Sequence, residues 1–196
     1  RKVALFCNVE PSAVIQSIDV PSIYEVPLKM QQQKLDEIVL QKTGMPIKST
    51  PELKPWKEFL ARMKNATESV RIGLVGKYVE LPDAYKSINE ALFQAATYND
   101  HKLDLKLIHS EKINKDNVEE MLGSMDGIII APGFGQRGIE GKFIALKYAR
   151  EHDVPTFGIC LGMQCMVIEF ARDVLGYADA NSTEMEVSTN HNVIDL

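Results

Sequence analysis

Apolar positions change their spacing along the chain, and from Val70 onward they become regular. Short apolar runs there alternate with stretches in which apolar residues recur every three to four positions. The expected strands are residues 71–76, 103–109, 126–131 and 154–159, and the expected helices are residues 84–99, 114–125, 140–152 and 161–172. This alternation predicts an α/β fold, a mostly parallel sheet with helices on both faces. In such folds functional residues gather at the carboxyl ends of the strands.

The residues before Val70 follow a less regular pattern. The expected elements are a strand at 2–9, a helix at 11–18 and, within 24–40, a short extended piece before a helix. Gly and Pro gather between residues 41 and 69, which is typical of a linker, although Pro55 can open a short helix from Trp56 to Lys64.

We therefore expect three parts: residues 1–40, a linker at 41–69, and a larger α/β domain at 70–196. The first residue is Arg1, not Met, and the last residues lie within an apolar run. We expect the chain to be a piece of a longer protein, with both flanking domains cut.

The net charge and the length of the apolar runs bear on whether the chain binds nucleic acid or a membrane. The net charge of −5 gives no basic footprint for nucleic acid, and no apolar run approaches the ~20 residues of a membrane helix. We expect neither a nucleic-acid nor a membrane partner, and no signal peptide. The three cysteines lack metal-ligand spacing, which favours reduced thiols in a cytoplasmic protein with no metal site.

The most informative stretch surrounds Cys160, which lies between an expected strand and an expected helix. Gly158 and Gly162 flank it at two residues on either side, the pattern of a nucleophile elbow with Cys in place of Ser. A helix N-terminus behind the sulfur favours a thiolate. A lone Cys is more often a small buried apolar residue, which is our expectation for Cys165 and Cys7, but the glycines favour a nucleophile at Cys160.

A glycine-rich loop, residues 131–138, follows the preceding expected strand. Such a loop is usually an ordinary turn. Beside an elbow on the next strand, however, its backbone N–H groups can form the second half of an oxyanion hole.

These motifs resemble the CTP synthase family. The resemblance is carried by GICLGMQ at 158–164, PGFGQRGIEGK at 132–142, Asn181–Glu184, GKYVELPDAYKS at 76–87, KVALFCNVEP at 2–11 and IDVPSIYEVPL at 18–28. It implies a class I glutamine amidotransferase-like domain preceded by the end of an α/β synthetase domain. Many relatives read Pro-Gly-Gly-Phe-Gly at the loop. Pro132 here replaces the first glycine, so an oxyanion donor must come from Gly133 or later.

The resemblance implies roles for individual residues. Cys160 would attack the amide of L-glutamine to form a thioester, with oxyanion N–H groups from Leu161 and Gly133. The implied glutamine-binding residues are Gly133, Leu161, Gly162, Met163, Gln164 and Glu184. A carboxylate suits the α-ammonium group of glutamine, although spacing alone leaves open that Glu184 is a solvated surface acid.

The family uses ATP and Mg²⁺ to phosphorylate UTP, and ammonia from glutamine then displaces the phosphate to give CTP. Lys2 matches a pyrimidine-nucleotide contact, and Ile18, Asp19 and Val20 match an adenine-nucleotide contact. The phosphate-binding loop and metal ligands are expected upstream, so we expect no cofactor in this chain. GTP activates glutamine hydrolysis in the family, and Lys77 and Arg137 are expected in that effector region.

One part of the family's catalytic machinery has no match. The resemblance implies a histidine and a glutamate in a downstream segment, but none of the four histidines, His101, His109, His152 and His191, has that context. We expect surface or capping roles for them, and little glutaminase turnover by this chain alone. The complete enzyme is expected to be a homotetramer, and this chain a monomer or weak dimer.

Two alternatives stay open. The chain could serve another acceptor as a glutaminase subunit, or be a cysteine hydrolase on the same scaffold. It could also be an inactive interaction fragment. The synthetase-like residues 2–11 argue against the first alternative, and activity with UTP would decide it.

Overall fold

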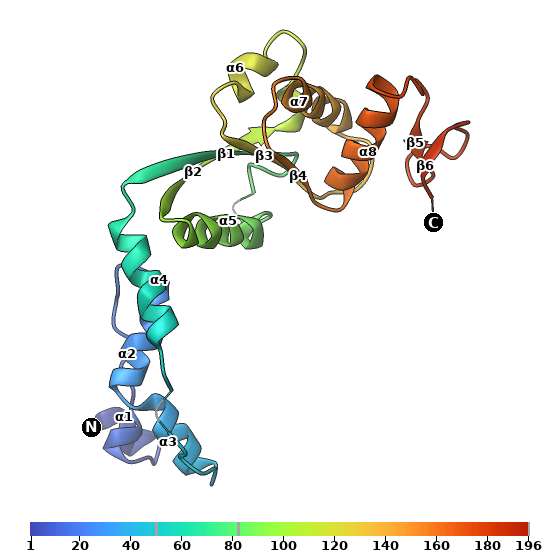
Figure 1. Cartoon of the computed structure of the whole chain (residues 1–196). Helices are drawn as coiled ribbons and strands as arrows, with labels where there is room; N and C mark the ends of the chain where they lie inside the picture. Colours follow the sequence, from blue (N-terminus) through green and yellow to red (C-terminus); the bar gives the residue numbers. More distant parts are fainter. Residues whose placement is uncertain (50, 82, 196) are drawn as a thin grey trace. The chain divides into compact units, whose positions relative to one another are not determined.

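The computed structural model describes residues 1–49, 51–81 and 83–195, which form two compact units, Arg1–Asn65 and Ala66–Leu196 (Figure 1). The division falls within the expected linker, residues 41–69. Each unit has its own packing and is described separately.

The first unit consists of short helices. They are α1 (Lys2–Phe6), the 3₁₀ turns η1 (Pro11–Ala13) and η2 (Ile23–Glu25), α2 (Val26–Gln32), α3 (Leu35–Lys42) and α4 (Lys54–Asn65). Helix α4 packs through an aromatic cluster: the ring of Tyr24 lies 5.9 Å from that of Trp56 and 5.3 Å from that of Phe59. The indole N–H of Trp56 also donates to the Tyr24 carbonyl at 2.7 Å. The expected helix at 56–64 is therefore confirmed, and its apolar face packs within the first unit.

Three expectations for the first unit are wrong. Residues 2–6 form a helix, not a strand, and Leu5 and Phe6 are 79% and 87% exposed. A strand needs a neighbour for its backbone groups, and the described part of this unit has no strand to pair with. Cys7 is consequently exposed instead of lying in a core. The helix expected at 11–18 is only the single turn η1, whereas the expected helical region up to residue 40 is present as α2 and α3.

The second unit contains a four-stranded parallel sheet, as predicted. Its strands are β1 (Glu68–Gly76), β2 (His101–His109), β3 (Gly127–Ile130) and β4 (Thr156–Gly158), in the order β2-β1-β3-β4. The register places Val75 beside both Ile108 and Ile130, and Ile130 beside Gly158. The carboxyl ends of β1, β3 and β4 are therefore neighbours along one edge of the sheet.

Helices cover both faces of this sheet. They are α5 (Lys86–Tyr98), η3 (Ser110–Lys112), α6 (Val118–Leu122), α7 (Ile139–Glu151) and α8 (Leu161–Asp173). Leu74 packs in a cluster with Tyr85 at the start of α5, and the next residue, Val75, packs in another cluster with Leu161 and Cys165 of α8. Successive strand residues point to opposite faces, so α5 lies on one face and α6 to α8 on the other (Figure 1). The predicted fold class is confirmed.

The pattern misplaced a few details of the second unit. Helix α6 is shorter than the expected 114–125. After α8 a two-stranded parallel sheet follows, β5 (Asn181–Ser182) with β6 (Asn192–Ile194), which the sequence did not predict. Such short strands give too few positions for a period of two to show.

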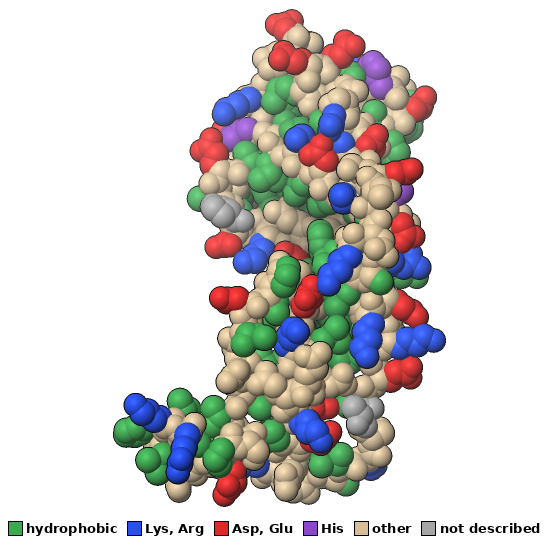
Figure 2. All heavy atoms as spheres, turned by 90° about the vertical axis from the view of Figure 1, so that its left-hand side faces the viewer, with side chains coloured by type: hydrophobic (Ala, Val, Ile, Leu, Met, Phe, Trp, Pro, Cys, Tyr) green, Lys and Arg blue, Asp and Glu red, His purple; other side chains and the backbone are tan. Residues whose placement is uncertain are grey.

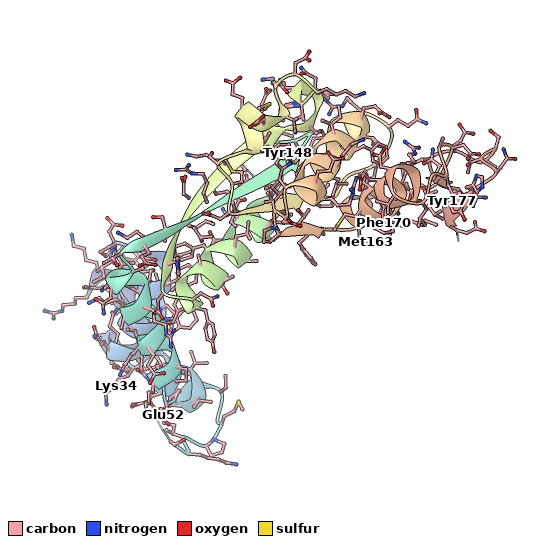
Figure 3. All side chains as sticks on the ribbon, turned by 45° about the horizontal axis from the view of Figure 1, so that its top comes forward. Lys34, Glu52, Tyr148, Met163, Phe170 and Tyr177 are labelled. Atoms are coloured by element: carbon pink, nitrogen blue, oxygen red, sulfur yellow. The ribbon has the colours of Figure 1, made fainter. Side chains whose placement is uncertain are left out.

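The surface of the second unit carries an apolar stripe on α8. Met163 and Phe170, which lie on this helix in Figure 3, are 48% and 47% exposed. Acidic and basic side chains are interspersed on the face shown in Figure 2, and the whole chain has a formal net charge of −5. Within the described residues, no helix is both long enough and apolar enough to cross a membrane.

Candidate active site

Cys160 lies at the junction of β4 and α8 in a backbone conformation that L-residues rarely adopt. Its φ is 53° and its ψ is −112°, and it is the N-cap residue of α8. Such strain persists only where the surrounding structure enforces it. Here Ile159 donates to the Ile130 carbonyl at 3.0 Å, and Gly162 donates to the Ile159 carbonyl at 2.8 Å. The elbow predicted from the sequence is present.

The two flanking glycines are required by close packing within the elbow. A Cβ on Gly158 would lie 2.5 Å from the backbone carbon of Gly162, and a Cβ on Gly162 would overlap the Ile130 carbonyl oxygen. Real Cβ atoms do not approach backbone atoms so closely, so any larger residue would push α8 away from β3 and β4. The glycines therefore set the position of Cys160 relative to the sheet.

The three thiols have different environments. Cys160 and Cys7 are exposed, whereas Cys165 is completely buried in α8. Burial raises the pKa of Cys165 to about 11, which keeps that thiol protonated and inert. This confirms the prediction that Cys165 belongs to the core, and it leaves Cys160 as the accessible thiol at the strand ends.

The glycine-rich loop lies beside the elbow. A Cβ on Gly133 would lie 3.8 Å from Cδ2 of Leu161, the first residue of α8, and 3.3 Å from Cε of Lys77, which follows β1. The Lys77 ammonium donates to the Phe134 carbonyl. Three strand ends thus meet here, contributing Lys77, Gly133 and Cys160, as expected for a parallel sheet.

The predicted glutamine-binding residues of two distant segments are brought together. Gln164, in the first turn of α8, donates from Nε2 to Glu184 Oε2 at 3.3 Å. A second hydrogen bond joins the glycine-rich loop to the segment that contains Glu184, because Gln136 Nε2 donates to the Met185 carbonyl at 3.1 Å. Glu184 is exposed, and the buried Oε1 of Gln164 has no hydrogen-bond partner among the described residues. The exposed Glu184 carboxylate is therefore the group of this pair that a ligand can reach.

Lys77 and Arg137, predicted in an effector region, flank one aromatic ring. The Lys77 ammonium lies 5.2 Å and the Arg137 guanidinium 5.8 Å from the centroid of Tyr78. Their accessibility differs, because Lys77 is 7% exposed whereas Arg137 is at the surface, where it pairs with Glu111 at 3.3 Å. Arg137 is the better placed of the two to meet a solute.

The four histidines have partners other than Cys160 in the described structure. His109 caps η3 by accepting from the Glu111 N–H, and His152 caps α7 and stacks on Tyr148 at 4.0 Å. His101 bonds the Asn99 carbonyl. His191 is 2.5 Å from Asp179, and this bond lowers the pKa of that carboxyl to about 2. These are the surface and capping roles predicted.

The predicted nucleotide-binding residues all lie in the first unit. Lys2 begins α1, and Ile18, Asp19 and Val20 lie in the irregular segment between η1 and η2. All but the half-buried Val20 are exposed. Within the described residues no hydrogen bond or ion pair joins Lys2 to the other three, so their roles stay predictions.

A comparison with protein families agrees with this geometry. Residues 80–195 match the family described as glutamine amidotransferase class-I. The chain belongs to this family. Its amidotransferase region includes the loop, the elbow and the turn with Glu184, and residues 1–45 separately match the family described as CTP synthase N-terminus.

Curated relatives of this amidotransferase chain match it from its first residue to its last, and the match spans little more than a third of their own length. It is 66% identical to a CTP synthase of Bacteroides fragilis and 64% identical to one of Porphyromonas gingivalis, over 100% of this chain but only 37% and 36% of those proteins. Among solved structures it resembles the glutaminase domain of Trypanosoma brucei CTPS with bound acivicin, at 38% identity and a TM-score of 0.60. That match covers 65% of this chain and 50% of that one.

One charged residue of the site was missed by sequence reasoning. Lys142 is 1% exposed, and its ammonium donates to the Ala131 carbonyl at 2.7 Å. A signal existed, because Lys142 shares helical spacing with Ile139, Ala145 and Leu146 on the buried face of α7. Within the described residues, no group of three His, Cys, Asp or Glu side chains could hold a metal ion, so no Mg²⁺ ligand is assigned to this chain.

Proposed function

We propose that this chain carries the glutaminase site of a CTP synthase, with Cys160 as its nucleophile. The observation that supports this most directly is the strained elbow that presents an exposed Cys160 beside the Gly133 loop and the Gln164–Glu184 pair. L-Glutamine is the substrate class that fits, because Glu184 offers a carboxylate for an α-ammonium group.

In the proposed reaction, the Cys160 thiolate attacks the side-chain amide carbon of glutamine. A sulfur–carbon bond forms, and the carbonyl electron pair moves to oxygen, where the N–H groups of Gly133 and Leu161 would stabilise the negative charge. Collapse of this intermediate breaks the carbon–nitrogen bond. The nitrogen takes up a proton, from solvent or from the downstream histidine that the resemblance implies, and leaves as ammonia. Water then cleaves the thioester to give glutamate and the free thiol.

We propose further that the complete protein uses this ammonia to convert UTP to CTP with ATP. The match of residues 1–45 to the CTP synthase N-terminus supports this acceptor over another. ATP with Mg²⁺, activation by GTP and a homotetramer belong to the same proposal. No step assigned to this chain uses the metal.

The test is CTP formation from UTP and ATP by the complete gene product, with either glutamine or ammonium chloride as the nitrogen source. Cys160→Ala should abolish the glutamine-dependent reaction and leave the ammonia-dependent one intact. Cys165→Ala is the matched control and should leave both. Loss of both reactions with Cys160→Ala, or retention of both, would contradict the proposal.

A further inference from the structure

Lys142 is a buried cation without a counter-ion. It is 1% exposed, and within the described residues its one hydrogen bond goes to the Ala131 carbonyl and it forms no ion pair. Burial lowers the pKa of Lys142; the nearby Cys165 opposes this shift and the Lys77 ammonium adds to it. Burying an unpaired ammonium is unfavourable, so an aliphatic side chain would suit this position better if it were only core.

The place to which Lys142 reaches is the start of the proposed oxyanion loop. Ala131 is anchored on one side, because its N–H donates to the Val75 carbonyl at 2.9 Å, and Lys142 holds its carbonyl. The next residue, Pro132, has no N–H with which to fix the chain. The bond from Lys142 is therefore the last anchor before Gly133.

A second ammonium holds the far side of the same turn. Lys77 donates to the Phe134 carbonyl, and its Cε lies near the position that a Cβ on Gly133 would occupy. Gly133 is thus bracketed by two lysines that approach from different elements, α7 and the end of β1. The electrostatic interactions of Lys142 also extend to Cys160.

We propose that Lys142 is a positioning residue for the glutaminase reaction. Together with Lys77 it clamps residues 131–134 so that the Gly133 N–H faces the oxygen of the substrate amide. This proposal rests on the proposed glutaminase function. The clamp also brings positive charge toward the place where the oxyanion forms, which favours the transition state.

The experiment compares Lys142→Met with Lys147→Met in this chain. Lys147 lies on the same helix, but it is half exposed and pairs with Asp173, so it controls for the loss of a lysine from α7. The rate of amide hydrogen exchange at Ala131, which directly follows β3, is compared with the rate at Ile128 within β3. The N–H of Ile128 donates to the Pro155 carbonyl. Labelling of Cys160 by a glutamine-analogue diazo-ketone gives the maximal rate and the half-saturating concentration.

Lys142→Met should accelerate exchange at Ala131 about tenfold relative to Ile128. It should also lower the maximal labelling rate roughly 10- to 100-fold with little change in half-saturation, since misplaced donors affect the transition state most. Lys147→Met should change neither. If Lys142→Met does not fold, Lys142→Gln replaces it. This variant keeps an N–H donor without the charge, and it should retain protection at Ala131.

Unchanged exchange at Ala131 would overturn the proposal. So would equal acceleration at Ile128 and Ala131, because that result describes general support of the fold. A Gln variant with an unprotected Ala131 would show that the bond to the carbonyl is not what holds the loop. Absence of labelling in the unmodified chain would count against the glutaminase function. The hydrogen-exchange comparison of Ala131 and Ile128 would still test whether Lys142 holds residues 131–134.

Discussion

Gln164 and Glu184 are joined by a hydrogen bond of 3.3 Å, although twenty residues separate them. The bond connects the first turn of α8 with the turn that follows β5. It places a carboxylate next to the helix N-terminus that carries Cys160. A site for a small zwitterion needs such an arrangement, with the nucleophile and the ammonium-binding acid on two different elements.

Glu184→Gln should weaken binding of a glutamine analogue about 10- to 100-fold, because a hydrogen bond to a charged group is lost. The maximal rate of Cys160 labelling should change much less. Glu186→Gln is the matched control, since Glu186 is an exposed acid two residues away that bonds Ser188 instead. Equal effects of the two substitutions would remove Glu184 from the binding site.

Gly162→Ala should destabilise the second unit by about 2–4 kcal/mol, because the added Cβ meets the Ile130 carbonyl and the backbone must move. Gly135→Ala is the control. Gly135 has a positive φ, of 70°, which Gly162 does not, but it has open space around it, so the cost should be about 1 kcal/mol. Urea denaturation measures both, and a smaller effect at Gly162 than at Gly135 would contradict the elbow geometry.

The buried Cys165 should make stability depend on pH in the alkaline range. Its folded pKa, about 11, is above the ordinary value, so its contribution is complete below about pH 8.5 and is lost as the pH rises toward 11. The unfolding free energy of the unmodified chain, relative to Cys165→Ala, should fall by roughly 2–3 kcal/mol between about pH 7.5 and about pH 10.5. A difference independent of pH would mean that the thiol is not desolvated.

Arg137→Gln should reduce the stimulation of glutamine hydrolysis by GTP in the complete gene product, with the unstimulated rate unchanged. Arg137 is exposed beside Tyr78, where a guanidinium and an aromatic ring can meet a nucleotide. Arg71→Gln is the control, because Arg71 lies within β1, where it is paired with Asp104 of β2. Unchanged stimulation in the Arg137 variant would remove this residue from the effector region.

Most of the second unit could be predicted from its sequence. Strands buried on both faces appear as unbroken apolar runs, such as Ile128–Ile130. The spacing of Gly158, Cys160 and Gly162 predicts the elbow. The strand predicted for residues 2–9 was wrong, because an apolar run forms a strand only if a partner strand is available. In the described structure Leu5 and Phe6 are surface residues of a helix.

The clamp could not be predicted in the same way. A lysine in a helix normally extends to solvent, and no local pattern indicates that the ammonium of Lys142 reaches a carbonyl eleven residues earlier in the chain. Its spacing places it on the apolar face of α7, but the partner depends on how α7 returns onto β3. Long-range contacts of this kind depend on the packed fold.

Cys160 is proposed to act as the nucleophile of a glutamine site. The most direct measurement is labelling of this chain with the diazo-ketone analogue of glutamine, followed by mass spectrometry of the peptides. Cys7 is an internal control, since it is also exposed but follows α1 as its C-cap residue and is not part of a strand–turn–helix elbow. We expect an adduct on Cys160 alone, which free glutamine suppresses and which Cys160→Ala abolishes. Labelling of Cys7 and Cys160 to the same extent, without protection by glutamine, would contradict it.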